Sequence, residues 1–296
     1  MTNTPALGLL LDIDGPIASP VSRSIAIPSI LSDLVELVRA GIPIAFITGR
    51  SAEFVADEVV APLRTAGLDD ALGGGGRMFV VCEKGAVWFA MTPDGPAPTE
   101  VDETVALPDE FRAHIRSVVD DRFGDSMFFD EGKLAMVSVE QRTDVSAEQY
   151  RPLQLEYNEV AFDALVERGL GARYGDREVP NAAGDIPFRI DPTIISTDVE
   201  SVTLDKDRGA ERALAFFEAQ GDLPRVWRSV GDSRSDYKMA DYLHSAGYEV
   251  AHVDVRPSDG VLEKPYEVVV EGDLIHDEAG AAFLSYWVQK LGLQRQ

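Results

Sequence analysis

Residues 7–16 have the sequence LGLLLDIDGP, and this stretch decides the fold class that we expect. Its first five residues are apolar, and so short an apolar run between turn residues favours a buried strand over a helix. The Gly-Pro pair at its end stops regular structure. We therefore predict a buried β-strand with two carboxylates, Asp12 and Asp14, at its carboxyl end.

Similar apolar runs alternate with helical patterns in the first third of the chain and again after residue 201. Because the predicted strands are apolar throughout, both of their faces should be covered, which is typical of a parallel sheet with helices on each side. We predict an α/β fold with a Rossmann-like, doubly wound parallel sheet as its core. The expected strands are 7–11, 43–47, 78–82, 86–91, 225–230 and 249–253, and the expected helices are 30–38, 52–60, 209–219 and 236–246.

A different pattern begins near residue 93, where the segment PDGPAPTEVDET is rich in proline and acidic residues, as surface crossings are. Helical and strand patterns then mix without the earlier alternation, which indicates an inserted α+β cap domain. We predict a core made of residues 1–92 and 197–296, with the cap at 93–196. Within the cap we expect helices at 111–119 and 157–168, and strands at 134–139, 188–190 and 193–196.

The charge of the chain limits its partners. It has 51 acidic and 27 basic residues, a formal net charge of −24, which repels nucleic acid and anionic lipid. No stretch approaches the ~20 apolar residues that cross a bilayer, and the N-terminus lacks the pattern of a cleavable signal peptide. We expect a cytoplasmic protein with neither a nucleic acid nor a membrane as partner, whereas its oligomeric state is not predictable.

Further polar residues follow or precede other predicted core elements. Thr48 follows the second strand, Lys206 precedes a helix, and Asp232 and Asp236 follow the strand that ends near Val230. The carboxyl ends of the strands line one crevice in a doubly wound sheet, so these residues can share a site with Asp12. Their types suit phosphoryl transfer, because a carboxylate can attack phosphorus while a lysine and Mg²⁺ neutralise its oxygens.

These motifs, in this order, resemble the four motifs of the haloacid dehalogenase (HAD) superfamily. They are Asp12-Ile-Asp14-Gly-Pro, Thr48-Gly49-Arg50, Lys206 and Gly231-Asp232-Ser233-Arg234-Ser235-Asp236. The insert between the second and third motifs is similar to the type II, or C2, cap of sugar phosphatases such as the Cof-like enzymes. The resemblance implies a Mg²⁺-dependent phosphatase that acts on a small phosphate monoester, such as a phosphorylated sugar, through an aspartyl-phosphate.

The resemblance also implies a role for each matching residue. Two departures concern Pro16, which lacks a backbone N–H in the first motif, and Ser235, which stands where the family often has asparagine. The implied roles are Asp12 as nucleophile, Asp14 as acid/base, Thr48, Gly49 and Lys206 as phosphate ligands, Asp12, the Asp14 carbonyl and Asp232 as metal ligands, and Asp236 with Ser235 in support.

Each motif alone has a plainer interpretation. The first could be a turn, Arg50 a solvated charge, and Lys206 a solvated lysine at a helix start. The order of all four favours the site. A phosphomutase and a non-catalytic phosphosugar-binding sensor remain alternatives, and a dehalogenase is disfavoured because it needs neither Mg²⁺ nor Asp14. The four histidines lack metal-ligand spacing, and the single cysteine, Cys82, is expected to be buried and without a role.

Overall fold

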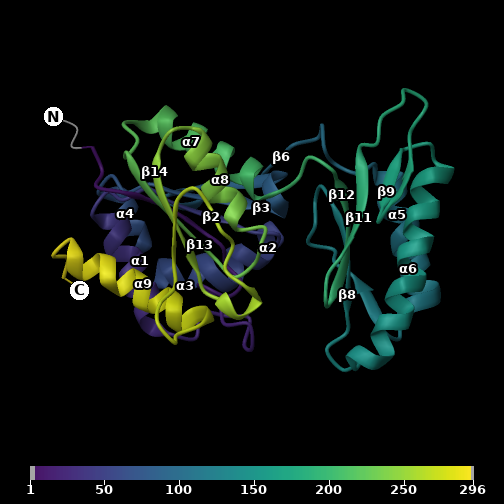
Figure 1. Ribbon diagram of the computed structural model, residues 1–296, viewed down its shortest axis with the longest axis horizontal. Coiled ribbons are helices and arrows are strands. Elements are labelled where there is room, and N and C mark those ends of the chain that lie inside the picture. The colour runs from purple at the N-terminus through teal and green to yellow at the C-terminus, as the bar shows by residue number, and fades with distance from the viewer. Residues whose placement is uncertain (1–3, 295–296) are drawn as a thin grey trace. The chain divides into compact units, whose positions relative to one another are not determined.

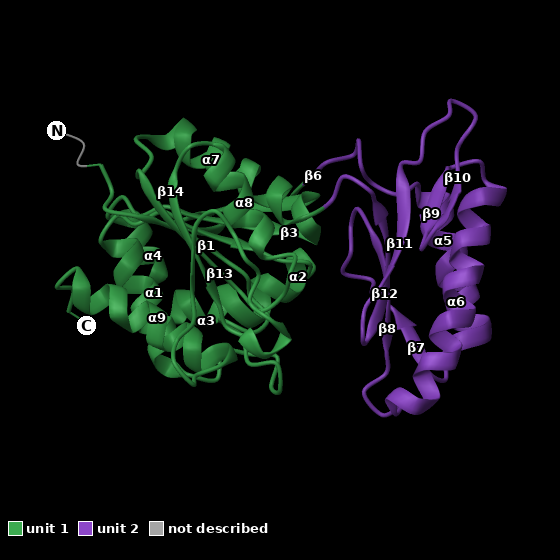
Figure 2. Cartoon of the chain, in the orientation of Figure 1, with its two compact units in different colours: residues 1–100, 205–296 green, residues 101–204 purple. Residues whose placement is uncertain are grey.

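The computed structural model describes residues 4–294. The chain divides into two compact units, which Figure 2 colours separately. One unit, the core, consists of Met1–Glu100 and Asp205–Gln296, and the other, the inserted unit, is Val101–Leu204. No helix in residues 4–294 combines the length and the apolar character that a bilayer crossing needs.

The core is built on a mainly parallel sheet, as predicted (Figure 1). The strands from β15 to β3 pair in parallel, and β4 and β5 add antiparallel edges. Strand β1 lies in the middle, and all of its residues are buried. In order across the sheet, the strands are β15 (Glu267–Val269), β14 (Glu249–Asp254), β13 (Val226–Gly231), β1 (Gly8–Leu11), β2 (Ile44–Ile47), β3 (Met78–Cys82), β4 (Val87–Thr92) and β5 (Gly95–Pro96), with β6 (Glu100–Val101) beside β4.

Helices cover both faces of this sheet, which explains why its strands are apolar throughout. On one face α7 and α8 pack on side chains from β1, β2, β3 and β13, including Leu10 and the fully buried Trp227. Helices α1 and α9 pack against each other away from that layer. The core helices are α1 (Pro28–Arg39), α2 (Ala52–Val55), α3 (Ala61–Thr65), α4 (Leu68–Gly73), α7 (Lys206–Gln220), α8 (Tyr237–Ser245) and α9 (His276–Lys290).

One helical prediction in the core needs correction. Ser51 caps α2, since its hydroxyl accepts the Phe54 N–H at 3.3 Å, but the helical segment expected at 52–60 continues to Thr65. A π-helical turn, Ala56–Val60, separates α2 from α3, and Pro62 stands in the first turn of α3. Proline is tolerated there because its missing N–H has no partner to lose in a first turn.

The inserted unit is a six-stranded sheet packed on two helices. Aromatic and aliphatic residues from both helices and from five strands form one buried cluster, which includes Phe111, Tyr157 and Val199. Its helices are α5 (Asp109–Val118) and α6 (Ala147–Glu167). Its strands, in order across the sheet, are β10 (Arg177–Val179), β9 (Ala172–Tyr174), β11 (Phe188–Pro192), β12 (Ser196–Ser201), β8 (Val137–Gln141) and β7 (Met127–Phe129).

The boundaries between the units lie later in the chain than we predicted. The predicted boundary at 196/197 would cut β12, which pairs along its length with β11 and β8. The sequence of β12, STDVES, is polar and does not suggest a buried strand, yet all six residues are buried. Burial is possible because their polar groups are paired: the Ser138 hydroxyl donates to Asp198 at 2.7 Å, and Arg189 pairs with Glu200 at 2.6 Å.

Helix α6 is also longer than predicted. It begins ten residues before the expected start at 157, because Ser146 and Gln149 form a reciprocal capping box at its N-terminus. Pro152 lies inside the helix, and this proline hides the first turns from a sequence-based reading.

A buried histidine links two strands of the core. His252 on β14 is 0% exposed, its Nδ1 lies 2.8 Å from the Ser229 hydroxyl on β13, and its ring packs at a tilt against Tyr237. Burial lowers the pKa of His252 to about 4, because an imidazolium would lose its hydration there. The folded protein therefore keeps this side chain neutral in mildly acidic solution.

We expect this histidine to make the protein less stable as the pH falls. An unfolded chain protonates histidine below about pH 6.5, whereas the folded chain does so only near pH 4, so the unfolded state binds the extra proton between these values. The contribution of His252 to the free energy of unfolding is fully present above pH 6.5. Acidification to pH 4 lowers that free energy by roughly 3 kcal/mol. Urea unfolding at a series of pH values measures it. His252→Asn should flatten the plot of the free energy of unfolding against pH. His244→Asn, at an exposed site, should not flatten it, and an unchanged slope in His252→Asn would contradict the prediction.

Candidate active site

The two acidic motifs of the core meet at the carboxyl ends of neighbouring strands. Strands β1 and β13 are parallel and pair Leu11 with Val230. The Asp12 N–H then donates to the Val230 carbonyl at 2.9 Å, so Asp12 and Asp232 leave the sheet side by side. Residues more than 200 positions apart in the sequence are thus neighbours, as the doubly wound fold predicted.

Lys206 lies between two carboxylates. As the first residue of α7, it places Nζ 2.5 Å from Asp12 Oδ1 and 2.5 Å from Asp236 Oδ1. All three residues are buried. Burial alone would lower the pKa of Lys206, but the charges of Asp12 and Asp236 raise it, so the side chain is a permanent cation. Burial raises the pKa of Asp12, and the Lys206 ammonium opposes that rise.

The second oxygen of Asp236 organises the loop after β13. Asp236 Oδ2 accepts the backbone N–H groups of Asp232, at 2.9 Å, and Ser233, at 2.7 Å, and also the Ser233 hydroxyl at 2.9 Å. Gly231 makes this possible, because a Cβ there would lie 2.2 Å from the Asp236 Cβ. Asp236 therefore contacts both Lys206 and the loop that carries Asp232. Ser235 belongs to the same loop, with its hydroxyl 2.8 Å from that of Ser233.

The Asp14 carboxylate points to an arginine that the sequence interpretation undervalued. Arg50 Nε donates to Asp14 Oδ2 at 2.9 Å, and Arg50 Nη2 donates to Asp14 Oδ1 at 2.8 Å. Burial would raise the pKa of Asp14, but these hydrogen bonds and the guanidinium charge lower it. Arg50 is not the solvated charge of the plainer interpretation. The signal that could have identified it is its place directly after Thr48 and Gly49.

Thr48 is fully buried at the end of β2, next to β1. Its hydroxyl oxygen accepts the Arg50 backbone N–H at 3.1 Å. The hydroxyl proton can therefore rotate toward a bound anion and donate to it. A turn after β3 supports this segment, since the Lys84 and Glu83 N–H groups donate to the Thr48 and Arg50 carbonyls. Gly49 lies against the side chain of Lys84.

The turn after β1 retains its hydrogen bonds despite Pro16. The Gly15 N–H donates to the Ala18 carbonyl at 3.0 Å, and the Ala18 N–H donates to the Ile13 carbonyl at 2.8 Å. Two features require glycine at position 15: its φ is +97°, and a Cβ there would lie 2.8 Å from the Asp232 Cβ. The first of the two motif departures therefore leaves the loop closed.

The acidic residues fit a magnesium ion. Asp12, Asp232 and Asp236 each place one carboxylate oxygen within 4.8 Å of the others, and oxygen atoms are the ligands that Mg²⁺ prefers. Asp236 already accepts three hydrogen bonds and forms an ion pair with Lys206, so Asp12 and Asp232 are the better metal ligands. The Asp14 side chain is held by Arg50, so only its backbone carbonyl fits the predicted ligand set. Burial, with Asp236 nearby, raises the pKa of Asp232 to about 6.

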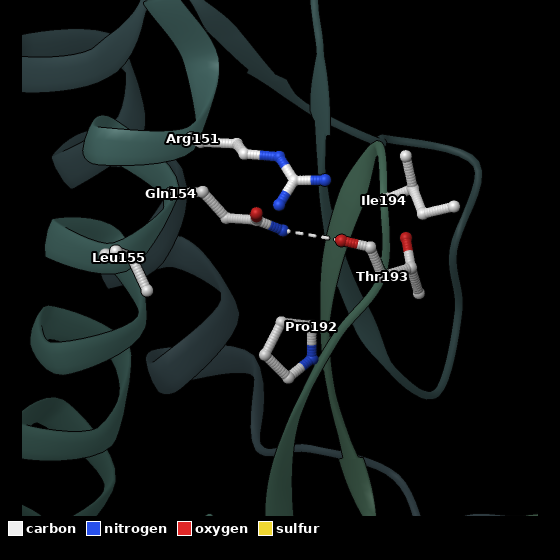
Figure 3. A pocket seen from close by; sticks show the side chains of 6 residues that line it. All are labelled: Arg151, Gln154, Leu155, Pro192, Thr193 and Ile194. Atoms are coloured by element: carbon white, nitrogen blue, oxygen red, sulfur yellow. Dashed lines mark hydrogen bonds between the residues drawn. The ribbon is translucent and has the colours of Figure 1, made fainter. Parts of the chain in front are cut away.

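The inserted unit contains a pocket of its own. It has a volume of about 360 Å³ and lies between α6 and the turn that joins β11 to β12 (Figure 3). The Gln154 amide donates to the Thr193 carbonyl across this pocket at 3.0 Å. The six lining residues, Arg151, Gln154, Leu155, Pro192, Thr193 and Ile194, include none of the predicted catalytic residues.

Solved structures share this fold over nearly the whole chain. The C-terminal domain of trehalose-6-phosphate phosphatase from C. albicans matches with a TM-score of 0.60 and 12% identity, covering 97% of this chain and 94% of that one. A haloacid dehalogenase-like hydrolase from Bacteroides thetaiotaomicron matches with a TM-score of 0.57 and 11% identity, covering 95% and 98%. The N-terminally truncated IMP-nucleotidase of Plasmodium falciparum matches with a TM-score of 0.50 and 11% identity, covering 94% and 69%.

These likenesses show that the chain has the fold of the haloacid dehalogenase-like hydrolases, as its motifs predicted. The matched proteins are a phosphatase, a hydrolase and a nucleotidase, and at 11–12% identity the likeness shows the shared fold. The finer likeness to Cof-like sugar phosphatases stays a prediction. No protein-family model and no curated protein sequence matches this chain.

Proposed function

We propose that this protein is a Mg²⁺-dependent phosphatase that hydrolyses a small phosphate monoester through an aspartyl-phosphate at Asp12. The observation that carries the proposal is the buried Lys206, held 2.5 Å from both Asp12 and Asp236 at the end of β1. A permanent cation beside a carboxylate at a strand end suits a nucleophile that must approach an anionic phosphoryl group.

In the first half-reaction, the Asp12 carboxylate attacks phosphorus and the bond to the leaving oxygen breaks. Lys206 and the Thr48 hydroxyl bind the oxygens of the phosphoryl group, and Asp14 gives a proton to the leaving oxygen. In the second half-reaction, water attacks the phosphorus of the aspartyl-phosphate and gives its proton to Asp14. Inorganic phosphate leaves and the Asp12 carboxylate is restored.

Asp12, Asp232 and the Asp14 carbonyl would hold the Mg²⁺ ion. When bound, the ion neutralises charge on the phosphoryl oxygens. This local compensation matters because the chain as a whole carries a formal charge of −24 and repels anions. Asp236, which already orders the loop and Lys206, would shape the site without being a ligand.

We propose a phosphorylated sugar, or a similar small polar molecule, as the substrate, and the inserted unit as the cap that selects it. The support is the similarity to a trehalose-6-phosphate phosphatase over 97% of the chain, inserted unit included, together with the charge that disfavours polyanions. A phosphomutase of the same fold would transfer the phosphoryl group to a hydroxyl and release no inorganic phosphate. A phosphosugar-binding sensor would bind without turnover.

The test is a panel of sugar phosphates, nucleoside monophosphates and an aryl phosphate, incubated singly with the protein and Mg²⁺. We expect release of inorganic phosphate, with the highest kcat/KM on a sugar phosphate. Excess EDTA should reduce the rate at least about a hundredfold, because metal ions supply several kcal/mol of transition-state stabilisation, and Mg²⁺ added back should restore it.

Three outcomes would contradict parts of this proposal. Full turnover in EDTA would exclude the metal. Saturable binding of sugar phosphates without phosphate release would favour the sensor, and isomerised product without phosphate would favour the mutase.

A further inference from the structure

The Asp14 carboxylate is held at both of its oxygens. Arg50 donates from Nε and Nη2, so the planar guanidinium and the planar carboxylate meet in a two-bond arrangement. Bidentate pairs of this kind set orientation as well as position, because neither plane can turn without losing a hydrogen bond.

The arginine is itself fixed from another side. Its guanidinium carbon lies 4.6 Å from the centre of the Phe54 ring, where cation–π attraction holds it. Its backbone N–H donates to the Thr48 hydroxyl. The Arg50 side chain is 18% exposed, whereas that of Asp14 is 36% exposed. Solvent does not restrict the exposed side of the carboxylate, so the hydrogen bonds to Arg50 are what hold Asp14 in one orientation.

We propose that Arg50 is a positioning residue that acts through Asp14 and mainly serves the second half-reaction. The inference rests on the proposed function, since it needs an aspartyl-phosphate at Asp12. The two hydrogen bonds from Arg50 fix the direction in which the Asp14 carboxylate points, and a base must point at the water whose proton it accepts. The clamp thus prepares Asp14 to act as the base toward water.

The step that depends on the clamp can be written in full. A water oxygen forms a bond to the phosphorus of the aspartyl-phosphate while the bond from phosphorus to the Asp12 oxygen breaks. The water proton goes to the Asp14 carboxylate, the Asp12 carboxylate is regenerated, and inorganic phosphate leaves. Without Arg50 the Asp14 carboxylate would turn away from the attacking water for much of the time, which slows this step.

Rapid-quench kinetics with an activated aryl phosphate test the proposal. Such a substrate needs no proton at its leaving group, so Arg50→Ala should form phospho-enzyme at near the wild-type rate. We expect its hydrolysis to slow about a hundredfold, the lower end of a general base contribution, so that phospho-enzyme accumulates. Arg50→Lys, which keeps the charge but loses the fork, should recover only part of the rate.

A double-mutant comparison separates action through Asp14 from direct contact with the substrate. If Arg50 acts through Asp14, Arg50→Ala should add no further loss to Asp14→Asn. The matched control is Arg64→Ala, which removes another bidentate arginine–aspartate pair of the core, with Asp69, and should leave every rate unchanged.

The possible failures point to different conclusions. Additive losses, or a raised KM with unchanged hydrolysis of the phospho-enzyme, would overturn the proposal in favour of substrate binding by Arg50. Equal slowing of both half-reactions would show a general structural role and would also overturn it. If instead Asp12→Asn and Asp14→Asn turn over like the wild type, the proposed function itself fails.

Discussion

Replacement of Asp12 by asparagine should abolish the release of inorganic phosphate, with a loss of about 10⁴-fold or more. An amide cannot attack phosphorus, and it removes one of the charges that would hold the metal ion. The change is nearly isosteric, and Lys206 keeps its second partner, Asp236, 2.5 Å away. The variant should therefore fold, and circular dichroism with a phosphate-release assay measures both properties.

The matched control for Asp12→Asn is Asp207→Asn. Asp207 follows Lys206 directly in the sequence, but its side chain is exposed and its carboxylate accepts the Arg208 backbone N–H. Loss of that charge should change the rate by less than about twofold, since exposed charges near water contribute little. A folded Asp12→Asn enzyme that turns over at near the wild-type rate would refute the nucleophile assignment.

Removal of Asp236 should have the largest effect on stability. Asp236→Ala deletes the acceptor of three hydrogen bonds and leaves Lys206, which is buried, with one carboxylate instead of two. Breaking a buried pair by removal of one partner costs about 3–5 kcal/mol, because the remaining charge stays buried. Urea unfolding should show this loss, and phosphatase activity should fall with it.

Asp232→Ala is the comparison that separates structure from chemistry. Asp232 lies in the same loop, but its side chain is 18% exposed, and the Arg256 guanidinium and the His276 ring each lie 3.9 Å from its carboxylate. We expect its removal to abolish activity while costing less than about 1 kcal/mol, as an exposed or distant ion pair does. Equal destabilisation by the two substitutions would show that Asp236 has no special structural role.

Much of the core was predictable because its strands are buried on both faces. Continuous apolar runs such as Phe79 to Val81 have few alternatives to a strand in a covered parallel sheet. The inserted unit was less predictable, since its sheet buries polar residues. Strand β12 escaped notice because Asp198 and Glu200 become compatible with burial only when paired with Ser138 and Arg189.

The candidate site likewise has features that the sequence predicts and features that only the tertiary structure shows. Residue types at strand ends, Asp12 and Asp232 above all, were readable from the sequence, because strand and turn patterns are local and parallel strands bring their carboxyl ends to one edge. The ion-pair partners of the site residues could not be predicted from the sequence. Arg50 and Asp14 are 36 positions apart, and whether they meet depends on the directions in which their side chains leave two different strand ends. That is a property of the packed core: local patterns place a residue on an element, but only the pairing of elements determines which charges become neighbours and are shielded from water.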